Sequence, residues 1–149
     1  MHTESGSLVH LGYASVAIPG FSREQIIAML RRARLKNETL GITGMLLFSD
    51  TSFLQVIEGP RTAVETLFTT IREDSRHRQV VRVFERPISR RTFDTWSMGL
   101  AFLERNQLEE IPGCNDFFRE GHCLSEATPS IAKRVLEAFK EGFWQLAVR

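Results

Sequence analysis

Residues 42–60 read ITGMLLFSDTSFLQVIEGP, and this stretch decides the fold. Its first part, residues 42–48, is almost entirely apolar and predicts a central strand. The letters DTS then form a short polar connection typical of a hairpin, and residues 53–58 predict the returning strand. Gly59-Pro60 closes that strand. An antiparallel pair of strands is therefore expected at the centre of the chain.

A strand and a helix precede this hairpin. Residues 8–15 predict a strand with a period of two. Ser22 is a good N-cap, and Gln25 completes a capping box with it, so a helix is expected to begin there. The helix is expected to end near Lys36-Asn37.

A helix and two strands follow the hairpin. Pro60 suits the first turn of a helix, which is expected to stop near Asp74. Residues 80–85 and 95–102 predict the fourth and fifth strands. A period of two gives the fourth strand apolar residues on both sides, Val81 and Val83 on one and Val80 and Phe84 on the other.

The order β-α-β-β-α-β-β predicts an α+β fold. Right-handed crossovers place both helices on one face of a mixed sheet, in a ferredoxin-like layout. The apolar second face then needs a cover. We expect residues 1–7 to form an N-terminal tail, residues 8–103 the sheet domain, and residues 104–149 a helical extension docked on the sheet or at an oligomer interface.

The C-terminal third predicts two helices. One covers about residues 103–111, and a longer one opens with Thr128 as N-cap and Pro129 in its first turn. The longer helix carries an apolar stripe made of Ile131, Val135, Leu136, Phe139, Phe143 and Leu146. Phe143 and Trp144 indicate an apolar contact surface, so we expect a homo-oligomer.

Composition bounds the class of protein. The 149 residues carry a formal net charge of +1, which gives no electrostatic reason to expect nucleic acid or an acidic membrane surface as a partner. Cys114 and Cys123 form neither a CxxC pair nor a paired zinc motif, so no metal is expected. The N-terminus lacks the pattern of a signal peptide, and no apolar segment is long enough to span a bilayer. We expect a soluble cytoplasmic protein with reduced thiols.

Gln55 is a polar residue at a position where apolar residues are expected. With a period of two it shares one face of its strand with Phe53 and Ile57. Burying a primary amide without partners costs about 1–3 kcal/mol, so Gln55 needs a hydrogen-bond partner. Tyr13, on the core side of the first strand, offers a phenol that both donates and accepts. The two residues form either a satisfied core pair or part of a ligand site.

Asn37 adds a second amide at the end of the first helix, where helix capping would explain it equally well. Together with Tyr13 and Gln55, it gathers phenol and amide groups at one end of the gap between the two helices. Apolar walls with a few oriented polar groups are typical of cofactor pockets. A flat heterocycle is expected to lie between Ile26, Met29 and Ile71.

A series of short motifs lies in register between Leu8 and Phe102. They are Tyr13-Ala14-Ser15, Lys36-Asn37, Gly41-Ile42-Thr43-Gly44, Phe53-Leu54-Gln55-Val56-Ile57-Glu58-Gly59, Asp74-Ser75-Arg76-His77 and Trp96-Ser97-Met98. One motif alone is weak, but the set in order is specific. The chain resembles the BLUF family, the blue-light sensors that use a flavin.

The resemblance implies roles for particular residues. The family's redox tyrosine falls on Tyr13, its switching glutamine on Gln55, and the asparagine that bonds the flavin ring edge on Asn37. Lys36 falls on a contact to the pyrimidine end of the ring. Other implied flavin contacts are Ser15, Asp74, Arg76 and His77, although helix-end capping explains Arg76 and His77 equally well. Trp96 and Met98 match the residues thought to respond to the glutamine, and core packing is the other explanation for them.

The cofactor implied by the resemblance is FAD, with FMN as the alternative. The implied function is that of a photoreceptor, not an enzyme, which signals to a separate and unidentified protein by rearranging hydrogen bonds around the flavin. Two alternatives stay open, a light-silent interaction module of the same fold and a small flavin-dependent redox enzyme. The second would need a nicotinamide or substrate site, and the sequence has no GxGxxG loop.

Overall fold

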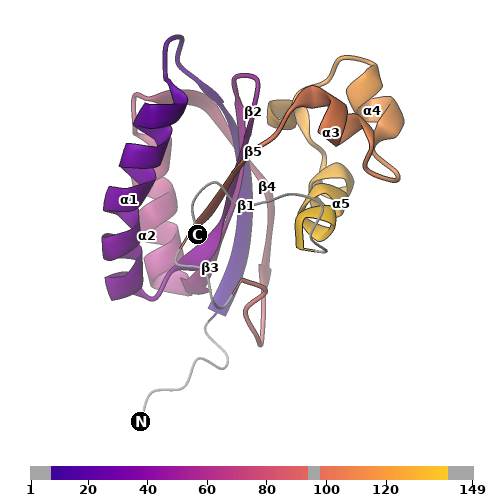
Figure 1. The fold of residues 1–149 in the computed structure, drawn as a ribbon. Helices are drawn as coiled ribbons and strands as arrows, with labels where there is room; N and C mark the ends of the chain where they lie inside the picture. The colour runs from indigo at the N-terminus through magenta and orange to yellow at the C-terminus, as the bar shows by residue number, and fades with distance from the viewer. Residues whose placement is uncertain (1–7, 94–97, 141–149) are drawn as a thin grey trace.

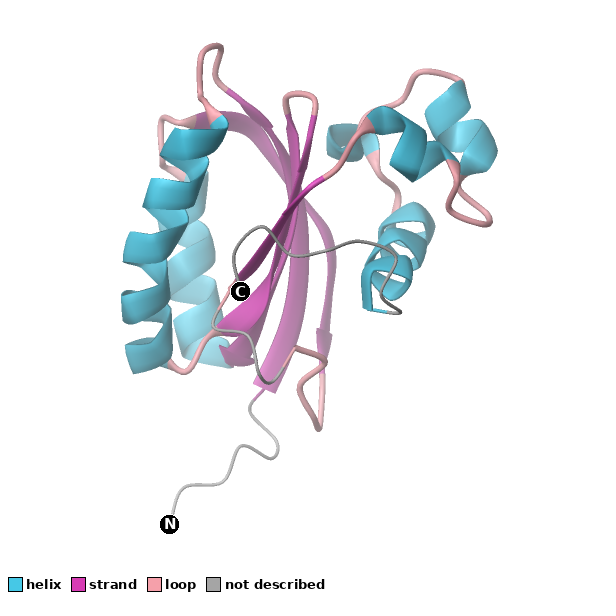
Figure 2. Ribbon diagram, in the orientation of Figure 1, coloured by secondary structure: helices cyan, strands magenta, loops and turns pink. Residues whose placement is uncertain are grey.

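A computed structural model describes residues 8–93 and 98–140 and shows a five-stranded sheet with helices on both sides (Figure 1). The strands are β1 (Leu8–Ala17), β2 (Thr43–Ser49), β3 (Ser52–Pro60), β4 (His77–Pro87) and β5 (Gly99–Phe102). Helices α1 (Arg23–Leu40) and α2 (Arg61–Arg72) cover one face of the sheet. On the other side lie α3 (Arg105–Glu109), α4 (Asn115–Arg119), the 3-10 turn η1 (Leu124–Glu126) and α5 (Pro129–Lys140) (Figure 2).

The sheet has the strand order β4-β1-β3-β2-β5. β1 pairs antiparallel with both β3 and β4, and β2 pairs antiparallel with β3. β5 joins the other edge of β2 in parallel. Each long helix connects two strands and both lie on the same face. The predicted α+β, ferredoxin-like order β-α-β-β-α-β-β is confirmed.

Helix α1 begins where the sequence predicts, directly after the N-cap residue Ser22. Ser22 Oγ accepts the backbone N–H of Gln25 at 3.1 Å, and Gln25 Oε1 accepts the backbone N–H of Ser22 at 2.9 Å. The helix continues to Leu40, beyond the predicted end at Lys36-Asn37. It stops at Gly41, whose φ of 73° lets the chain turn left-handed. Asn37 therefore lies inside the last turns of α1 and not at its terminus.

β4 corrects one prediction. Gly12 pairs with Phe84 and Tyr13 with Arg82, so Val83 is an extra residue in a bulge. The bulge shifts the alternation of sides, and Val80 packs on the side of α1 and α2 while Phe84 packs on the opposite face. The prediction that Val80 and Phe84 share a side is wrong. Both faces of β4 nevertheless carry apolar residues, as expected.

Several boundaries differ from the sequence prediction. Pro60 is the N-cap of α2, one residue before its first turn. The fifth strand begins at Gly99, while residues 95–97 lie outside the described part of the chain. Thr128 caps α5 as predicted, with Oγ1 3.3 Å from the backbone nitrogen of Ile131. The predicted tail, residues 1–7, and the end of the last helix, with Phe143, Trp144 and Leu146, also lie outside the described residues.

The sheet separates two apolar clusters. One lies under α1 and α2 and includes Leu11, Ile26, Ile57 and Phe68. The other lies under the C-terminal helices and includes Val56, Phe118, Val135 and Phe139. The second face therefore has the cover that its apolar residues require. Among the described helices, none is both long and apolar enough to cross a membrane.

Candidate cofactor site

A cavity of about 310 Å³ lies on the α1–α2 side of the sheet. The sheet contributes Tyr13, Leu46, Phe53 and Gln55, and Met98 lies just before β5. The remaining lining residues come from the loop before α1, from the two helices, from the turn after α2 and from the first residue of β4: Phe21, Met29, Leu30, Arg32, Ala33, Lys36, Asn37, Leu67, Thr70, Ile71, Asp74, Arg76 and His77. The site is therefore built where the two helices stand apart above β1 and β3.

A chain of hydrogen bonds runs along one wall of the cavity. The Tyr13 hydroxyl donates to Gln55 Oε1, and Gln55 Nε2 donates to the Met98 sulfur at 3.2 Å. All three residues are buried, with exposed fractions of 3%, 8% and 0%. Tyr13 and Gln55 lie directly opposite each other in the β1–β3 pair. The structure thus brings together two residues far apart in sequence and orients the amide between a phenol and a thioether.

Burial and, to a smaller extent, the charge of Asp74 raise the pKa of the Tyr13 phenol. The phenol therefore stays protonated at neutral pH and can only act as the donor toward Gln55 Oε1. The amide nitrogen of Gln55 carries two N–H groups, and only one is directed at the sulfur, which is a weak acceptor. Gln55 therefore has a donor to offer to a ligand.

His77 is held in a defined tautomer at the cavity. Its Nε2 lies 2.7 Å from the carbonyl oxygen of Ile71, which can only accept, so Nε2 carries the proton. In the neutral ring, Nδ1 then accepts from the Ser15 hydroxyl at 2.9 Å. The ring contacts Tyr13 edge-on, with centroids 6.1 Å apart. Ser15 thus acts behind His77 and does not line the cavity.

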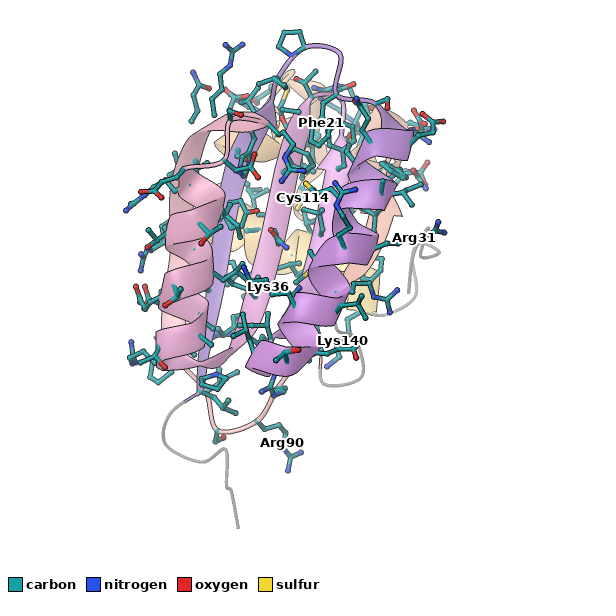
Figure 3. The ribbon with its side chains drawn as sticks, turned by 90° about the vertical axis from the view of Figure 1, so that its left-hand side faces the viewer. Phe21, Arg31, Lys36, Arg90, Cys114 and Lys140 are labelled. Atoms are coloured by element: carbon teal, nitrogen blue, oxygen red, sulfur yellow. The ribbon has the colours of Figure 1, made fainter. Side chains whose placement is uncertain are left out.

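Cationic residues lie near the opening of the site. Arg32, Lys36 and Arg76 all line the cavity, and Arg32 and Lys36 are exposed. Figure 3 shows Lys36 on the side of α1 that faces α2, whereas Arg31 lies on the opposite side of that helix. Arg76 binds Asp74 through Nε at 3.0 Å and 3.2 Å, and this contact lowers the pKa of Asp74. Asp74 therefore stays ionised and holds Arg76 in place.

Most of the predicted site residues line the cavity. Tyr13, Met29, Lys36, Asn37, Gln55, Ile71, Asp74, Arg76, His77 and Met98 do so. Ile26 does not, because it is fully buried in the cluster between α1 and the sheet and Met29 takes the outer position. Trp96 lies outside the described residues.

Other lining residues were missed by sequence reasoning. Phe21, Leu30, Arg32, Ala33, Leu46, Phe53, Leu67 and Thr70 belong to this group. Most are ordinary members of apolar stripes, and no local pattern separates an apolar cavity wall from a core position. Spacing could have found Arg32 and Ala33, since both lie one turn before Lys36 or Asn37 on α1.

A buried phenol–amide–thioether chain beside an open apolar slot defines a protein that holds a flat, polar-edged cofactor. The amino-acid sequence of the protein matches the BLUF family, "Sensors of blue-light using FAD", over residues 8–99. This match covers more than half of the sequence, and the protein belongs to the BLUF family. BLUF domains bind flavin, so a flavin is the cofactor of this fold.

Similar proteins include a photoactivated adenylate cyclase subunit beta of Euglena longa, 38% identical over 141 residues, or 91% of this chain. This chain spans only 16% of that relative. The solved dark state of the BLUF protein BlrB is 32% identical, with a TM-score of 0.73 over 93% of this chain and 98% of that one. Klebsiella pneumoniae BlrP1, solved with FMN and cyclic diGMP, is 34% identical, with a TM-score of 0.63 over 91% of this chain and 35% of that one.

The residues present fit a flavin ring. The walls from α1 and α2 are apolar at Met29, Ala33 and Ile71, as the two faces of a flat ring require. Gln55 and Asn37 line the cavity with amide groups, which would suit a ring edge that carries carbonyl and nitrogen acceptors. Within residues 8–93 and 98–140, no group of three or more His, Cys, Asp or Glu side chains is placed to hold a metal ion.

Proposed function

We propose that this chain is a blue-light photoreceptor that acts as a sensor and not as an enzyme. Its flavin would be FAD or FMN, and its signal would pass to a separate protein. The observation that carries the proposal is the continuous chain from the Tyr13 hydroxyl through the Gln55 amide to the Met98 sulfur, along one wall of the cavity. Such a chain can change its pattern of donors without any change in the fold.

The flavin, when bound, supplies the absorption of blue light and an excited state that accepts an electron. Tyr13 would be the residue that gives up an electron and then the proton of its hydroxyl, and both would return to it, so the cycle would have no net redox product. While the hydroxyl is without its proton, the Tyr13 oxygen can only accept a hydrogen bond. The hydrogen bond from Tyr13 to Gln55 Oε1 is then lost. Gln55 would rotate or tautomerise, so that Oε1 no longer faces Tyr13. Met98 loses or changes its contact with Gln55 Nε2.

The energy of this rearrangement limits what it can drive. One rearranged hydrogen bond is worth about 1–2 kcal/mol, which shifts a balanced equilibrium by about five- to thirtyfold. The element that responds must already be close to balance between two arrangements. The strand that begins after Met98, together with the C-terminal helices that follow it, is the element proposed to respond.

The test is an absorption spectrum of the flavin-loaded protein in darkness and after blue light. We expect a small shift to longer wavelength that reverses in darkness. Tyr13→Phe and Gln55→Leu should each abolish the shift while flavin remains bound. Ser49→Ala is a matched control, because Ser49 is buried on β2 and its hydroxyl has no hydrogen-bond partner among the described residues.

Four outcomes would contradict parts of the proposal. A reversible shift in Tyr13→Phe removes Tyr13 from the photochemistry, and one in Gln55→Leu removes Gln55. A protein that stays colourless after flavin is added is a light-silent module. Flavin turnover with a nicotinamide would instead make it a redox enzyme.

Residues 8–103 are proposed as the flavin-binding domain, residues 1–7 as a tail and residues 104–149 as the extension that carries the signal. Contacts of the second apolar cluster support docking of the extension on the sheet, since they join the sheet to residues 103–139. A homo-oligomer remains a prediction, because Phe143 and Trp144 lie outside the described residues. Size-exclusion chromatography with light scattering, in darkness and under blue light, measures it directly.

A further inference from the structure

Glu58 anchors the segment between β4 and β5 on the face of the sheet opposite the cavity. It follows Gln55 on β3 at an odd spacing, so its side chain points to the other face. The side chain is 0% exposed, and its carboxylate accepts the backbone N–H groups of Thr92 at 2.9 Å and of Phe93 at 2.8 Å. A third bond of 2.7 Å comes from Nδ1 of His10, directly across the β1–β3 pair. The carboxylate is thus held by two strands and holds a loop.

Arg91 strengthens the same anchor. Its Nη1 donates to Thr43 Oγ1 at 2.9 Å and to the backbone oxygen of Glu58 at 3.3 Å. Thr43 and Glu58 are paired residues of β2 and β3. Three consecutive residues of the segment, 91–93, are therefore fixed to the two central strands.

The other end of the segment reaches the photoswitch. Met98 is 0% exposed, lies in the cluster under α1 and α2, and accepts the Gln55 amide. Phe93 lies in the cluster on the opposite face, together with Val135 and Phe139 of α5. Phe93 and Met98, five positions apart in the sequence, thus lie on opposite faces of the sheet.

We propose that Glu58 is a positioning residue for the light response: it fixes Thr92 and Phe93 so that Met98 stands opposite Gln55. This inference rests on the proposed function. Gln55 and Glu58 belong to one strand, so a single rigid element carries the switching amide on one face and the anchor of its acceptor on the other. Through Phe93, the same anchor connects the segment to α5.

The charge state of Glu58 suits this role. Burial alone would raise its pKa, but hydrogen bonds from His10, Phe93 and Thr92 outweigh burial and leave the pKa below its usual range. The carboxylate is therefore ionised at neutral pH, and its bonds to backbone N–H groups are charge-assisted. Glutamine at this position would keep the shape but would turn an NH₂ group toward N–H donors.

The test is a double-mutant cycle of Glu58→Gln and Met98→Leu in the full chain loaded with FAD. The readout is the rate of recovery in darkness after blue light. Glu58→Gln keeps Tyr13 and Gln55, so the spectral shift should remain, while the recovery rate should change by roughly three- to tenfold. In the Met98→Leu background, Glu58→Gln should change the rate less than twofold, because Glu58 acts through Met98.

A second readout follows Met98 itself. The chain has four methionines, so methyl-labelled methionine gives few NMR signals, and the loss of one in Met98→Leu assigns it. In Glu58→Gln the Met98 methyl signal should move in darkness, whereas the signal of Met29, on α1, should not. Glu58→Asp, which keeps the charge, should move the Met98 signal less and restore part of the recovery rate.

Additive effects of Glu58→Gln and Met98→Leu on recovery, or an unmoved Met98 signal in folded Glu58→Gln, would overturn the inference. If Glu58→Gln does not fold, Glu58→Asp takes its place in the cycle, with the same criteria. A wild-type protein with no reversible spectral shift would instead overturn the proposed function, so the two failures are distinguishable.

Discussion

Tyr13 and Gln55 meet because β1 and β3 are antiparallel neighbours in which these two residues are direct partners. Side chains at such positions have Cβ atoms about 4.5–5.5 Å apart, close enough for a phenol and an amide to bond. Gln55 is oriented from both sides, by the Tyr13 hydroxyl at one end and the Met98 sulfur at the other. At the residue scale, the site is therefore an amide whose direction is set by a donor at one end and an acceptor at the other.

Glu58 predicts an acid-dependent stability. Its folded-state pKa is lowered, so its contribution is fully present above the unfolded pKa of about 4.3 and is lost as pH falls through the folded value. Unfolding in urea should show wild type losing stability below about pH 4.5, with a flatter profile for Glu58→Gln. At neutral pH the substitution should cost roughly 3 kcal/mol. Parallel pH profiles for the two proteins would mean that the carboxylate is not held as described.

Gly12 leaves no room for a side chain on the face of β1 that points away from the cavity. A methyl group added there would overlap the ring of Phe84, which stacks on His10 with centroids 5.2 Å apart and so has little freedom to move. Gly12→Ala should destabilise the fold by about 1–3 kcal/mol in urea unfolding. Phe84→Leu in the Gly12→Ala background should recover part of this loss. Equal stability of Gly12→Ala and wild type would show that the ring yields freely.

The sequence could predict the side of each strand on which these residues lie, but not their partners. Period-two alternation placed Gln55 on the same face as Phe53 and Ile57, and Tyr13 on the same face as Leu11. Register comes from pairing across the sheet, and the bulge at Val83 arises between strands, so neither is written in a local pattern. The contact of Glu58 with Thr92 and Phe93 joins separate segments and was invisible for the same reason.

At the scale of elements, α1 forms one wall of the cavity, and its ends are set by local chemistry. The capping box at Ser22 and the left-handed Gly41 fix where the helix begins and ends. The sequence predicts the start of the helix clearly, because Ser22 and Gln25 form the capping-box pattern that marks a helix N-terminus. It showed the end less well, since residues 36–40 are compatible with a helix and only Gly41 stops it.

Ser22 predicts a measurable effect of capping. Ser22→Ala removes the acceptor for the Gln25 backbone N–H and should destabilise the protein by about 1 kcal/mol. Ser22→Thr keeps a hydroxyl in the same place and should restore most of that stability. Both effects are measured by the urea concentrations at which half of each of the three proteins is unfolded. The comparison assumes the same m-value, the slope of the unfolding free energy against urea, for all three. Equal midpoints for wild type and Ser22→Ala would show that α1 is held by packing alone.

At the scale of the whole molecule, charge is balanced overall but not locally. The formal net charge is +1, so the protein has no strong general attraction for anions. Arg32, Lys36 and Arg76 nevertheless gather at the cavity. The positive charge of these three residues would attract a ligand that carries phosphate, but it would not attract a neutral ligand in the same cavity.

The affinity for flavins should therefore depend on salt only when the flavin carries phosphate. FMN should bind more weakly by a few-fold between about 0.05 M and 0.5 M NaCl, whereas riboflavin, which lacks phosphate, should change little. Arg32→Gln should weaken FMN binding about threefold at low salt and leave riboflavin unaffected. Arg31→Gln is the matched control, because Arg31 lies on the side of α1 away from α2 and should affect neither ligand (Figure 3). Fluorescence titration of the apoprotein measures all of these affinities. Equal losses for FMN and riboflavin in Arg32→Gln would show that Arg32 supports the ring and not the phosphate.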